Sequence, residues 1–280
     1  MKTAWPLLLL LGSCGGQPVI APGGIVSNNP CIDSILAEIA APGQIAAVSV
    51  YSHDADSASA PVAWTRALPA LGTNAEDIIA AKPKLVLTGN LASSGTNAAL
   101  KNAGIPIVAV GVGTSIEEDK SQIRQIAKAI GRAEAGDALI ARIDASFAQS
   151  AVMRPSISAV IWQNGGFVAG AGTLQDELLT RHGFRNASAA YGLKSWGVLP
   201  LETLIRNPPQ IIFMPAKGDG DDERALTARK QLLRHLGGGA RLVDFPDKLL
   251  FCGGPTIIKV SAILAATRAA FDRPTRKDGG

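Results

Sequence analysis

Apolar residues along the chain alternate between short continuous runs and helical spacings. In the segment 31–39, for example, Ile32, Ile35, Leu36 and Ile39 fall on one face of a helix. The continuous runs are typical of parallel strands that are buried on both faces. The clearest of these runs are residues 85–87 and 211–213, and further strands are predicted at residues 24–26, 45–50, 105–110 and 157–162. Strands that alternate with helices predict a parallel sheet with right-handed crossovers.

Two stretches in different halves of the chain repeat one pattern. In each, a glutamate opens a short amphipathic helix, a proline stands seven residues later, and an apolar run begins two residues after the proline. The residues are Glu76, Pro83 and Leu85 in one copy and Glu202, Pro209 and Ile211 in the other. A carboxylate in the first turn favours the helix, and the proline ends it. The repeat predicts two similar α/β halves, although such a joint also recurs by chance in α/β proteins.

The segment between the halves has a different pattern. Residues 115–150 are mostly helical in spacing, and the spacing is broken only around Gly131. We interpret this segment as a stiff helical connector between an N-terminal lobe, residues 24–114, and a C-terminal lobe, residues 151–280. A stiff connector predicts that the lobes flex modestly instead of swinging wide.

Composition agrees with a globular chain of two domains. Its 280 residues are 47% hydrophobic and 18% charged, which suffices for two cores of ordinary size. The net charge of +4 is scattered and forms no basic cluster with interleaved aromatic residues. Nucleic acid is therefore not an expected partner.

The N-terminus has the features of an export signal. Met1 and Lys2 supply a positive start, residues 7–11 are apolar, and the run ending at Cys14 has the form of a lipoprotein signal. This stretch is too short for a permanent membrane span. We expect residues 1–14 to be the signal, Cys14 to carry the lipid, and the Gly- and Pro-rich residues 15–23 to be a flexible tether. These features predict a periplasmic location, with a lipid anchor as the membrane contact.

Loops that follow the carboxyl ends of parallel strands are where ligands bind in such folds. These loops hold polar and aromatic side chains, among them the loop at 162–166 and Lys217. As ligand-binding residues we predict Asn29, Tyr51, His53, Trp64, Asn90, Trp162, Asn164, Tyr191, Trp196 and Cys252. The alternative for His53 is a solvated loop residue. His182 is expected at a helix C-terminus, where a cationic ring would offset the dipole, and His235 is expected to be structural.

Motifs of several enzyme classes are missing from the sequence. It has no Gly-x-Ser-x-Gly nucleophile elbow, no Gly-x-x-x-x-Gly-Lys-Ser/Thr phosphate loop and no His-Glu-x-x-His zinc helix. The Gly-Val-Gly at 111–113 is a fragment of a dinucleotide fingerprint without its third glycine. We therefore predict that the chain is not an enzyme and needs no cofactor.

Several segments together resemble a known family. They include Ile25–Pro30, Gly72–Leu87, Gly104–Val108, Gly170–Thr173, Gly183–Asn186 and Pro200–Glu202. Their order and spacing are similar to those of periplasmic substrate-binding proteins of ABC importers for cobalamin, haem and iron-siderophores. The resemblance covers roughly Gly24 to Phe271. It implies two Rossmann-like α/β lobes with parallel central sheets, a single long α-helix joining them, and a ligand cleft between the lobes.

The resemblance also implies partners. In similar proteins one surface glutamate on each lobe docks into arginine-rich pockets of the transporter's membrane subunits, and Glu76 and Glu202 match those positions. The chain would then be a monomer that captures a metal chelate in the periplasm and delivers it to an ABC permease. A corrinoid such as cobalamin is favoured, because the cleft loops hold few of the arginines that an anionic siderophore would require. Haem and an iron-siderophore are the alternatives.

Two cysteines depart from the family pattern at cleft-facing positions. Cys31 and Cys252 could form a disulfide, make a soft metal contact or be there by coincidence. Two other classes of protein therefore stay open. One is a metal-binding envelope lipoprotein that uses Cys31, Cys252 and His53, and the other is an enzyme on a related fold.

Overall fold

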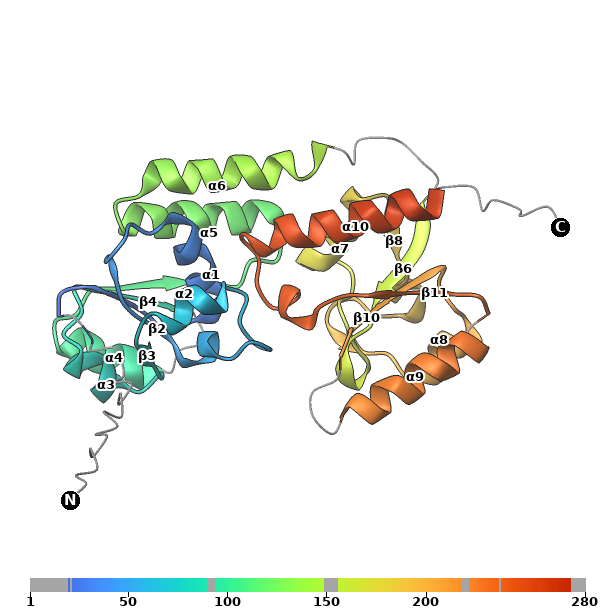
Figure 1. Ribbon diagram of the computed structural model, residues 1–280, viewed down its shortest axis with the longest axis horizontal. Helices are drawn as coiled ribbons and strands as arrows, with labels where there is room; N and C mark the ends of the chain where they lie inside the picture. The colour runs from blue at the N-terminus through green and yellow to red at the C-terminus, as the bar shows by residue number, and fades with distance from the viewer. Residues whose placement is uncertain are drawn as a thin grey trace, which may run out of the picture.

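The computed structural model describes residues 20, 22–89, 94–148, 156–217, 222–236 and 238–272. Two α/β lobes lie side by side, and a pair of helices lies above the N-terminal lobe in the view of Figure 1. Across these residues no helix is both long and apolar enough to cross a membrane. The predicted signal with Cys14, and Asn90, lie outside the described residues.

The N-terminal lobe contains a five-stranded parallel sheet in the order β3-β2-β1-β4-β5. Its strands are β1 (Ile25–Ser27), β2 (Ile45–Ser49), β3 (Ala70–Leu71), β4 (Leu85–Gly89) and β5 (Ile107–Val110). Its helices are α1 (Pro30–Ile39), η1 (Val50–His53), α2 (Val62–Arg66), α3 (Ala75–Ala80) and α4 (Ser94–Asn102). Ile25 and Leu87 join the core under α1, whereas Val26 and Val86 pack with Ile78 of α3 on the other face. Both faces are therefore buried, as the continuous apolar runs predict.

The C-terminal lobe has a four-stranded parallel sheet in the order β11-β10-β6-β8. Its strands are β6 (Ile157–Ile161), β8 (Phe184–Asn186), β10 (Ile211–Met214) and β11 (Arg241–Asp244), and a separate antiparallel ribbon pairs β7 (Phe167–Val168) with β9 (Gly197–Val198). Its α-helices are α7 (Leu174–Arg181), α8 (Leu201–Arg206), α9 (Asp222–Leu236) and α10 (Thr256–Asp272). Its short 3₁₀ turns are η3 (Asn164–Gly166), η4 (Ala187–Tyr191) and η5 (Asp247–Leu249).

The two sheets repeat the same strand order. The N-terminal series β2-β1-β4-β5 corresponds to β8-β6-β10-β11 in the C-terminal lobe. The repeated helix–proline–strand joint is α3–β4 in one lobe and α8–β10 in the other. Each of these strands pairs with the first strand of its lobe, β4 with β1 and β10 with β6. The predicted two parallel-sheet lobes are confirmed.

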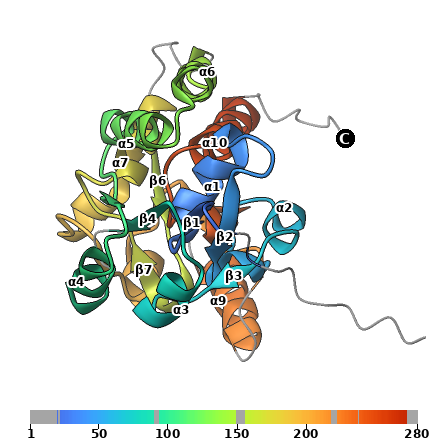
Figure 2. The same ribbon diagram turned by 90° about the vertical axis from the view of Figure 1, so that its left-hand side faces the viewer.

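The connector differs from the single long helix that the resemblance implied. It consists of α5 (Ile116–Ala129) and α6 (Ala133–Ala145), and α6 turns back along α5 (Figure 1). The break comes at Gly131, whose φ of +70° ends the first helix. Polar contacts tie this break to the N-terminal lobe, because Gln44 Nε2 donates to Ile130 O at 2.6 Å and Arg132 Nε donates to Ile39 O at 3.1 Å. Helix α5 lies on the opposite side of the N-terminal sheet from α3 (Figure 2).

One hydrophobic core spans both lobes on the connector side. Ile35 and Leu36 of α1 belong to the same buried cluster as Leu178 of α7 and Leu264 of α10, and Ile126 of α5 joins them. Separating the lobes along this side would expose apolar surface, which costs free energy in proportion to its area. This shared core favours modest flexing of the lobes.

Candidate functional site

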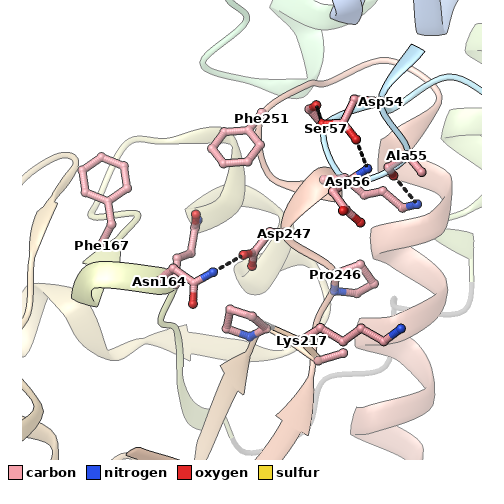
Figure 3. A pocket seen from close by; sticks show the side chains of 14 residues that line it. Asp54, Ala55, Asp56, Ser57, Asn164, Phe167, Lys217, Pro246, Asp247 and Phe251 are labelled. Carbon is pink, nitrogen blue, oxygen red and sulfur yellow. Dashed lines mark hydrogen bonds between the residues drawn. The ribbon is translucent and has the colours of Figure 1, made fainter. Parts of the chain in front are cut away.

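A cavity of about 910 Å³ lies between the lobes. The N-terminal lobe contributes one loop to it, and the C-terminal lobe contributes the loops that follow β6, β10 and β11 (Figure 3). The lining residues are Asp54, Ala55, Asp56, Ser57, Gln163, Asn164, Phe167, Pro215, Ala216, Lys217, Pro246, Asp247, Lys248 and Phe251. The predicted Asn164 and the loop residue Lys217 are among them.

The position of the cavity follows from the topology of the C-terminal sheet. Strand β6 comes first in this lobe, and its two neighbours β8 and β10 lead the chain in opposite directions across the sheet. The loops that leave β6 and β10 therefore diverge at their carboxyl ends, which is where open α/β sheets bind ligands. Residues 163–164 follow β6 and residues 215–217 follow β10.

A buried carboxyl group holds the N-terminal loop that faces the cavity. Asp33 Oδ2 accepts hydrogen bonds from Ser49 N at 2.9 Å and from Ser52 Oγ at 2.6 Å. Burial raises the pKa of Asp33 to about 7, although these hydrogen bonds oppose the rise. The bonds position η1 and thus the lining residues 54–57 that follow it.

The loop itself is organised around Asp54. Its carboxylate accepts hydrogen bonds from Ser57 Oγ at 2.6 Å and from Asp56 N at 3.1 Å. These two bonds lower the pKa of Asp54, so its carboxylate is charged at neutral pH. The cavity therefore has a fixed negative charge on its N-terminal side.

Residues after β11 connect the two walls. Lys248 Nζ donates to Ala55 O at 3.3 Å, and Ser59 Oγ donates to Lys248 O at 2.9 Å, so Lys248 bridges the lobes. Within the C-terminal lobe, Asn164 Nδ2 donates to Asp247 Oδ2 at 3.1 Å (Figure 3). The segment from Pro246 to Lys248 thus contacts both halves of the cavity wall.

The two cysteines meet across the lobes. Cys31 at the start of α1 is joined to Cys252 by a disulfide, with Cα atoms 5.1 Å apart. Cys252 is 5% exposed and outside the lining, so its predicted ligand contact is corrected, whereas its neighbour Phe251 lines the cavity. Because both cysteines are in the disulfide, neither has a free thiol to ligate a metal, as the hypothesis of a metal-binding lipoprotein requires. Among the described residues, no group of three or more His, Cys, Asp or Glu side chains could hold a metal ion.

An aromatic pair marks one side of the cavity. Phe167 of β7 lines it and stacks on Trp196, with ring centroids 5.1 Å apart and planes 12° from parallel. Trp196, which the sequence predicts, is 40% exposed and outside the lining, whereas Phe167 in the lining is not among the predicted residues. The signal for Phe167 was weak, because β7 is two residues long and pairs with a strand far along the chain.

Two other predicted aromatic residues have structural roles instead. Trp162 is buried, and its Nε1–H donates to Leu199 O at 2.8 Å. The hydroxyl of Tyr191 donates to Asn207 O at 2.6 Å. Neither side chain lines the cavity. The indole N–H and the phenol O–H each donate a hydrogen bond to a backbone carbonyl of a residue distant in sequence.

The N-terminal predictions need similar correction. His53 Nε2 lies 2.9 Å from Thr65 O and 3.1 Å from Leu68 O, so this nitrogen carries the proton and donates. It therefore cannot ligate a metal through that atom. Trp64 packs against the main core, and Asn29 caps α1 by accepting from the N–H groups of residues 31 and 32. Tyr51 is exposed but outside the lining.

The other histidines lie at helix ends. His182 caps α7 as predicted, with Nδ1 2.8 Å from Leu178 O. Burial lowers its pKa, so the ring is neutral near pH 7 and the expected compensation of the dipole by a cationic ring is corrected. His235 lies in the last turn of α9.

Two exposed glutamates occupy equivalent places on the two lobes. Glu76 is in the first turn of α3 and Glu202 is in the first turn of α8. Both helices lie on the side of the molecule away from α5 and α6 (Figure 1). The arrangement is compatible with a partner that contacts both lobes at once.

Comparison with known proteins gives one family match. The family described as periplasmic binding protein matches residues 25–236. No curated protein is similar enough to the chain to count as a significant match.

Solved structures share the fold. A periplasmic haem-binding protein, RhuT from Roseiflexus sp. RS-1, has a TM-score of 0.70 and 23% identity over 89% of this chain and 100% of its own. The haem-binding protein HutB of Vibrio cholerae has a TM-score of 0.70 and 18% identity over 90% and 99%. CeuE of Helicobacter pylori with bound Ni(II) has a TM-score of 0.68 and 16% identity over 89% and 84%. At these identities the likeness shows the fold and leaves the ligand of this chain open.

Proposed function

The chain belongs to the periplasmic binding protein family, and from this premise we propose that it is the substrate-binding component of an ABC importer that captures a metal chelate, preferably a corrinoid. The observation that carries the proposal is the cavity of about 910 Å³ between the two lobes. This volume is at the upper end for small-molecule sites and suits a macrocycle better than a single ion.

The charge of the lining favours a ligand that is neutral or cationic. Three carboxylates, Asp54, Asp56 and Asp247, face two ammonium groups, Lys217 and Lys248. An anionic siderophore, or the two propionates of haem, would meet this excess of negative charge. A corrinoid has a positively charged cobalt centre and mostly uncharged carboxamide side chains, so it avoids that repulsion.

The lining also lacks the usual axial ligands of haem iron. Among the described residues that line the cavity there is no His, Tyr, Met or Cys. Haem iron in proteins is usually held by one of these side chains. Cobalamin brings its own lower axial base and needs no such residue from the protein.

Aromatic surface is available for the ring system. The stacked pair of Phe167 and Trp196 stands on the C-terminal side, and Phe251 is 60% exposed in the lining. Aromatic faces bury large apolar area and suit flat ligands. The polar groups beside them would orient the ligand.

Haem is the second candidate, and Tyr51 is the observation that favours it. Its side chain is 58% exposed on η1, directly before the lining loop. A phenolate from this position could ligate iron if the ligand extended beyond the cavity toward η1.

Isothermal titration of the purified full chain with cyanocobalamin, haemin and a ferric siderophore tests the ligand. We expect saturable binding of one cyanocobalamin and weaker or no binding of the other two. Haem binding that depends on Tyr51, with no corrinoid binding, would move the assignment to haem. Saturable binding to none of the three would overturn the proposed ligand class.

Delivery to the permease is assigned to Glu76 and Glu202. Their exposure in the first turns of α3 and α8 supports this role, because both carboxylates are available to arginines of a partner. The permease would then be held through charge-assisted contacts that orient the encounter and can be released. We place this step in the periplasm, with Cys14 as the site of a lipid anchor.

A further inference from the structure

Two neighbouring amide side chains in the cavity wall have hydrogen-bonding capacity that the fold does not use. Gln163 is 4% exposed, and its Nε2 has no hydrogen-bond partner among the described residues. The same holds for Oδ1 of Asn164, which is also buried. Both residues line the cavity between the lobes. One unused donor and one unused acceptor therefore stand on consecutive residues of the wall.

Unused polar atoms of this kind are rare in folded proteins. Most buried polar side-chain atoms have a partner, because leaving one without a partner costs free energy. The residue directly before the pair shows the usual outcome, because the buried indole N–H of Trp162 bonds Leu199 O. A ligand group that supplied both missing bonds would recover the cost on binding.

The loop that carries the pair is well defined. Gln163 N donates to Phe167 O at 2.8 Å, and Gly166 N donates to Gln163 O at 2.9 Å. The turn needs left-handed backbone at Gly165 and Gly166, with φ of +69° and +79°, which glycine adopts without strain. The backbone on either side of the two amides is thus held by its own hydrogen bonds.

The orientation of the Asn164 amide follows from its neighbour. Its Nδ2 donates to Asp247 Oδ2 at 3.1 Å (Figure 3). This bond directs the nitrogen toward Asp247 and leaves Oδ1 as the remaining acceptor. The subsite consequently offers one N–H from Gln163 and one carbonyl oxygen from Asn164.

We propose that Gln163 and Asn164 form a subsite that binds a carboxamide of the ligand. The ligand carbonyl accepts from Gln163 Nε2, and the ligand N–H donates to Asn164 Oδ1. The proposal rests on the proposed function and narrows it, since corrinoids carry carboxamides around their rim. A carboxylate in the same place would set its oxygens against Asn164 Oδ1 and near the negative charge of Asp247, so the subsite selects amides over acids.

Titration of the full chain with two kinds of ligand tests the selection. Cyanocobalamin carries every amide, whereas its monocarboxylic acids, made by mild hydrolysis of the propionamide side chains, each carry one acid in place of an amide. We expect at least one of these acids to bind about tenfold more weakly than cyanocobalamin, or worse. Equal binding of all the acids and cyanocobalamin would overturn the subsite.

Substitutions of Gln163 and Asn164 test whether these two residues form the subsite. Gln163→Met removes the donor and Asn164→Leu removes the acceptor, each with little change in size, and we expect about tenfold loss of cyanocobalamin affinity for each. Asn97 provides the matched control, because its Oδ1 is also buried without a partner but lies on α4, outside the cavity lining. Asn97→Leu is expected to bind like the wild type. Thermal unfolding of every variant separates loss of binding from loss of folding, and Gln163→Glu is a second variant if Gln163→Met unfolds.

The outcomes separate the two proposals. If the wild-type chain binds cyanocobalamin and the Gln163 and Asn164 variants bind it within about twofold, the subsite is refuted and the proposed function stands. If the wild-type chain binds no corrinoid, the proposed function fails and the subsite fails with it.

Discussion

Cys31 of the N-terminal lobe and Cys252 of the C-terminal lobe are joined by a disulfide that crosses between the lobes beside the cavity. Cys252 follows Phe251, which lines the cavity, and Cys31 opens the helix that packs under the N-terminal sheet. The bond therefore ties the two walls at one edge, in addition to the shared core on the connector side. Such a bond persists in an oxidising compartment such as the periplasm.

The first prediction concerns this disulfide. The variant Cys31→Ser/Cys252→Ser is expected to lose stability on the order of 2–5 kcal/mol, because the unfolded chain is no longer cross-linked over the separation of 221 residues. Equilibrium unfolding in guanidinium measures the change. A reducing agent should shift the wild type to the midpoint of the double variant and leave the variant unchanged. Identical midpoints for the oxidised wild type and the variant would contradict the prediction.

The second prediction concerns pH. Asp119 on α5 is 3% exposed, and burial, followed by the charges of Glu118 and Glu177, raises its pKa from 3.8 to about 7. The folded state therefore holds the proton more tightly than the unfolded state. The contribution of protonated Asp119 to the free energy of unfolding is complete below its unfolded pKa of about 4. That contribution is lost as pH rises toward 7. The loss amounts to about 4 kcal/mol over this range.

Unfolding free energies of the wild type measured at pH 5 and pH 8 should show this fall. Asp119→Asn should reduce the difference between the two pH values. Part of the fall should persist, because Asp33 has a pKa raised to about 7 by burial as well. Asp137, exposed on α6, supplies the control variant Asp137→Asn. If the free energy of unfolding of the wild type increases from pH 5 to pH 8, the predicted direction of the pH dependence is wrong.

The third prediction tests the contact between Asp119 and the C-terminal lobe. A Cβ on Gly253 would overlap the Asp119 carboxylate, and one on Gly113 would lie 2.6 Å from its Oδ1. Gly253→Ala is therefore expected to destabilise the protein by about 1–3 kcal/mol. At Gly72 a Cβ would meet nothing within 4 Å, so Gly72→Ala is the control. Asp119→Ala should relieve the effect of Gly253→Ala, and thermal unfolding of the four proteins gives the coupling. Additive effects would show that the two residues do not interact.

Some of the fold could be predicted because its signals are local. The spacing of Glu76 and Pro83, repeated by Glu202 and Pro209, predicts the joints α3–β4 and α8–β10, and the continuous apolar runs predict strands that are buried on both faces. The connector is mostly helical as expected. The chain reverses direction at Gly131, however, and the break is bonded to Ile39 at the end of α1 and to Gln44 in the loop before β2, contacts that no local pattern records.

The site was predicted less well, since a loop's position does not say where each side chain points. The strand-end rule selects Asn164, which lines the cavity, but it also selects Trp162 and His53, which do not. The indole of Trp162 bonds the carbonyl of Leu199, and His53 Nε2 bonds carbonyls of residues 65 and 68. These partners are set by tertiary packing that no local pattern records. The same holds for Phe167, whose place depends on the pairing of β7 with β9.

The fourth prediction separates two tryptophans that the sequence could not tell apart. Trp196→Ala should weaken cyanocobalamin binding about tenfold or more and change stability little, because the ring is 40% exposed beside the cavity. Trp162→Phe should leave affinity unchanged and destabilise the fold by about 1–3 kcal/mol, because Leu199 O loses its buried donor. Calorimetric titration and thermal unfolding of both variants measure the two effects. If Trp162→Phe weakens binding and Trp196→Ala lowers only stability, the two residues have the opposite roles and the prediction is wrong.

The fifth prediction concerns delivery to the permease. Glu76→Ala and Glu202→Ala each remove an exposed carboxylate from the first turn of a short helix, and neither residue lines the cavity. Loss of a carboxylate–arginine contact should weaken docking about tenfold or more per site. Combining the two changes is expected to abolish uptake by cells and leave ligand affinity and stability unchanged. Charge reversal to Lys at either position should impair uptake more than Ala, since a lysine would repel the partner's arginines.

The control for docking is Glu134→Ala. Glu134 is also an exposed glutamate in the first turn of a helix, but that helix is α6, on the side of the molecule opposite α3 and α8 (Figure 1). Uptake with this variant should equal that of the wild type, which separates a docking role from a general effect of helix-terminal charge. If Glu76→Ala or Glu202→Ala lowers ligand affinity, or if both variants support full uptake, the docking role is refuted. Because the two glutamates stand on different lobes, loss of uptake from each of the two single variants would also show that the permease must contact both lobes.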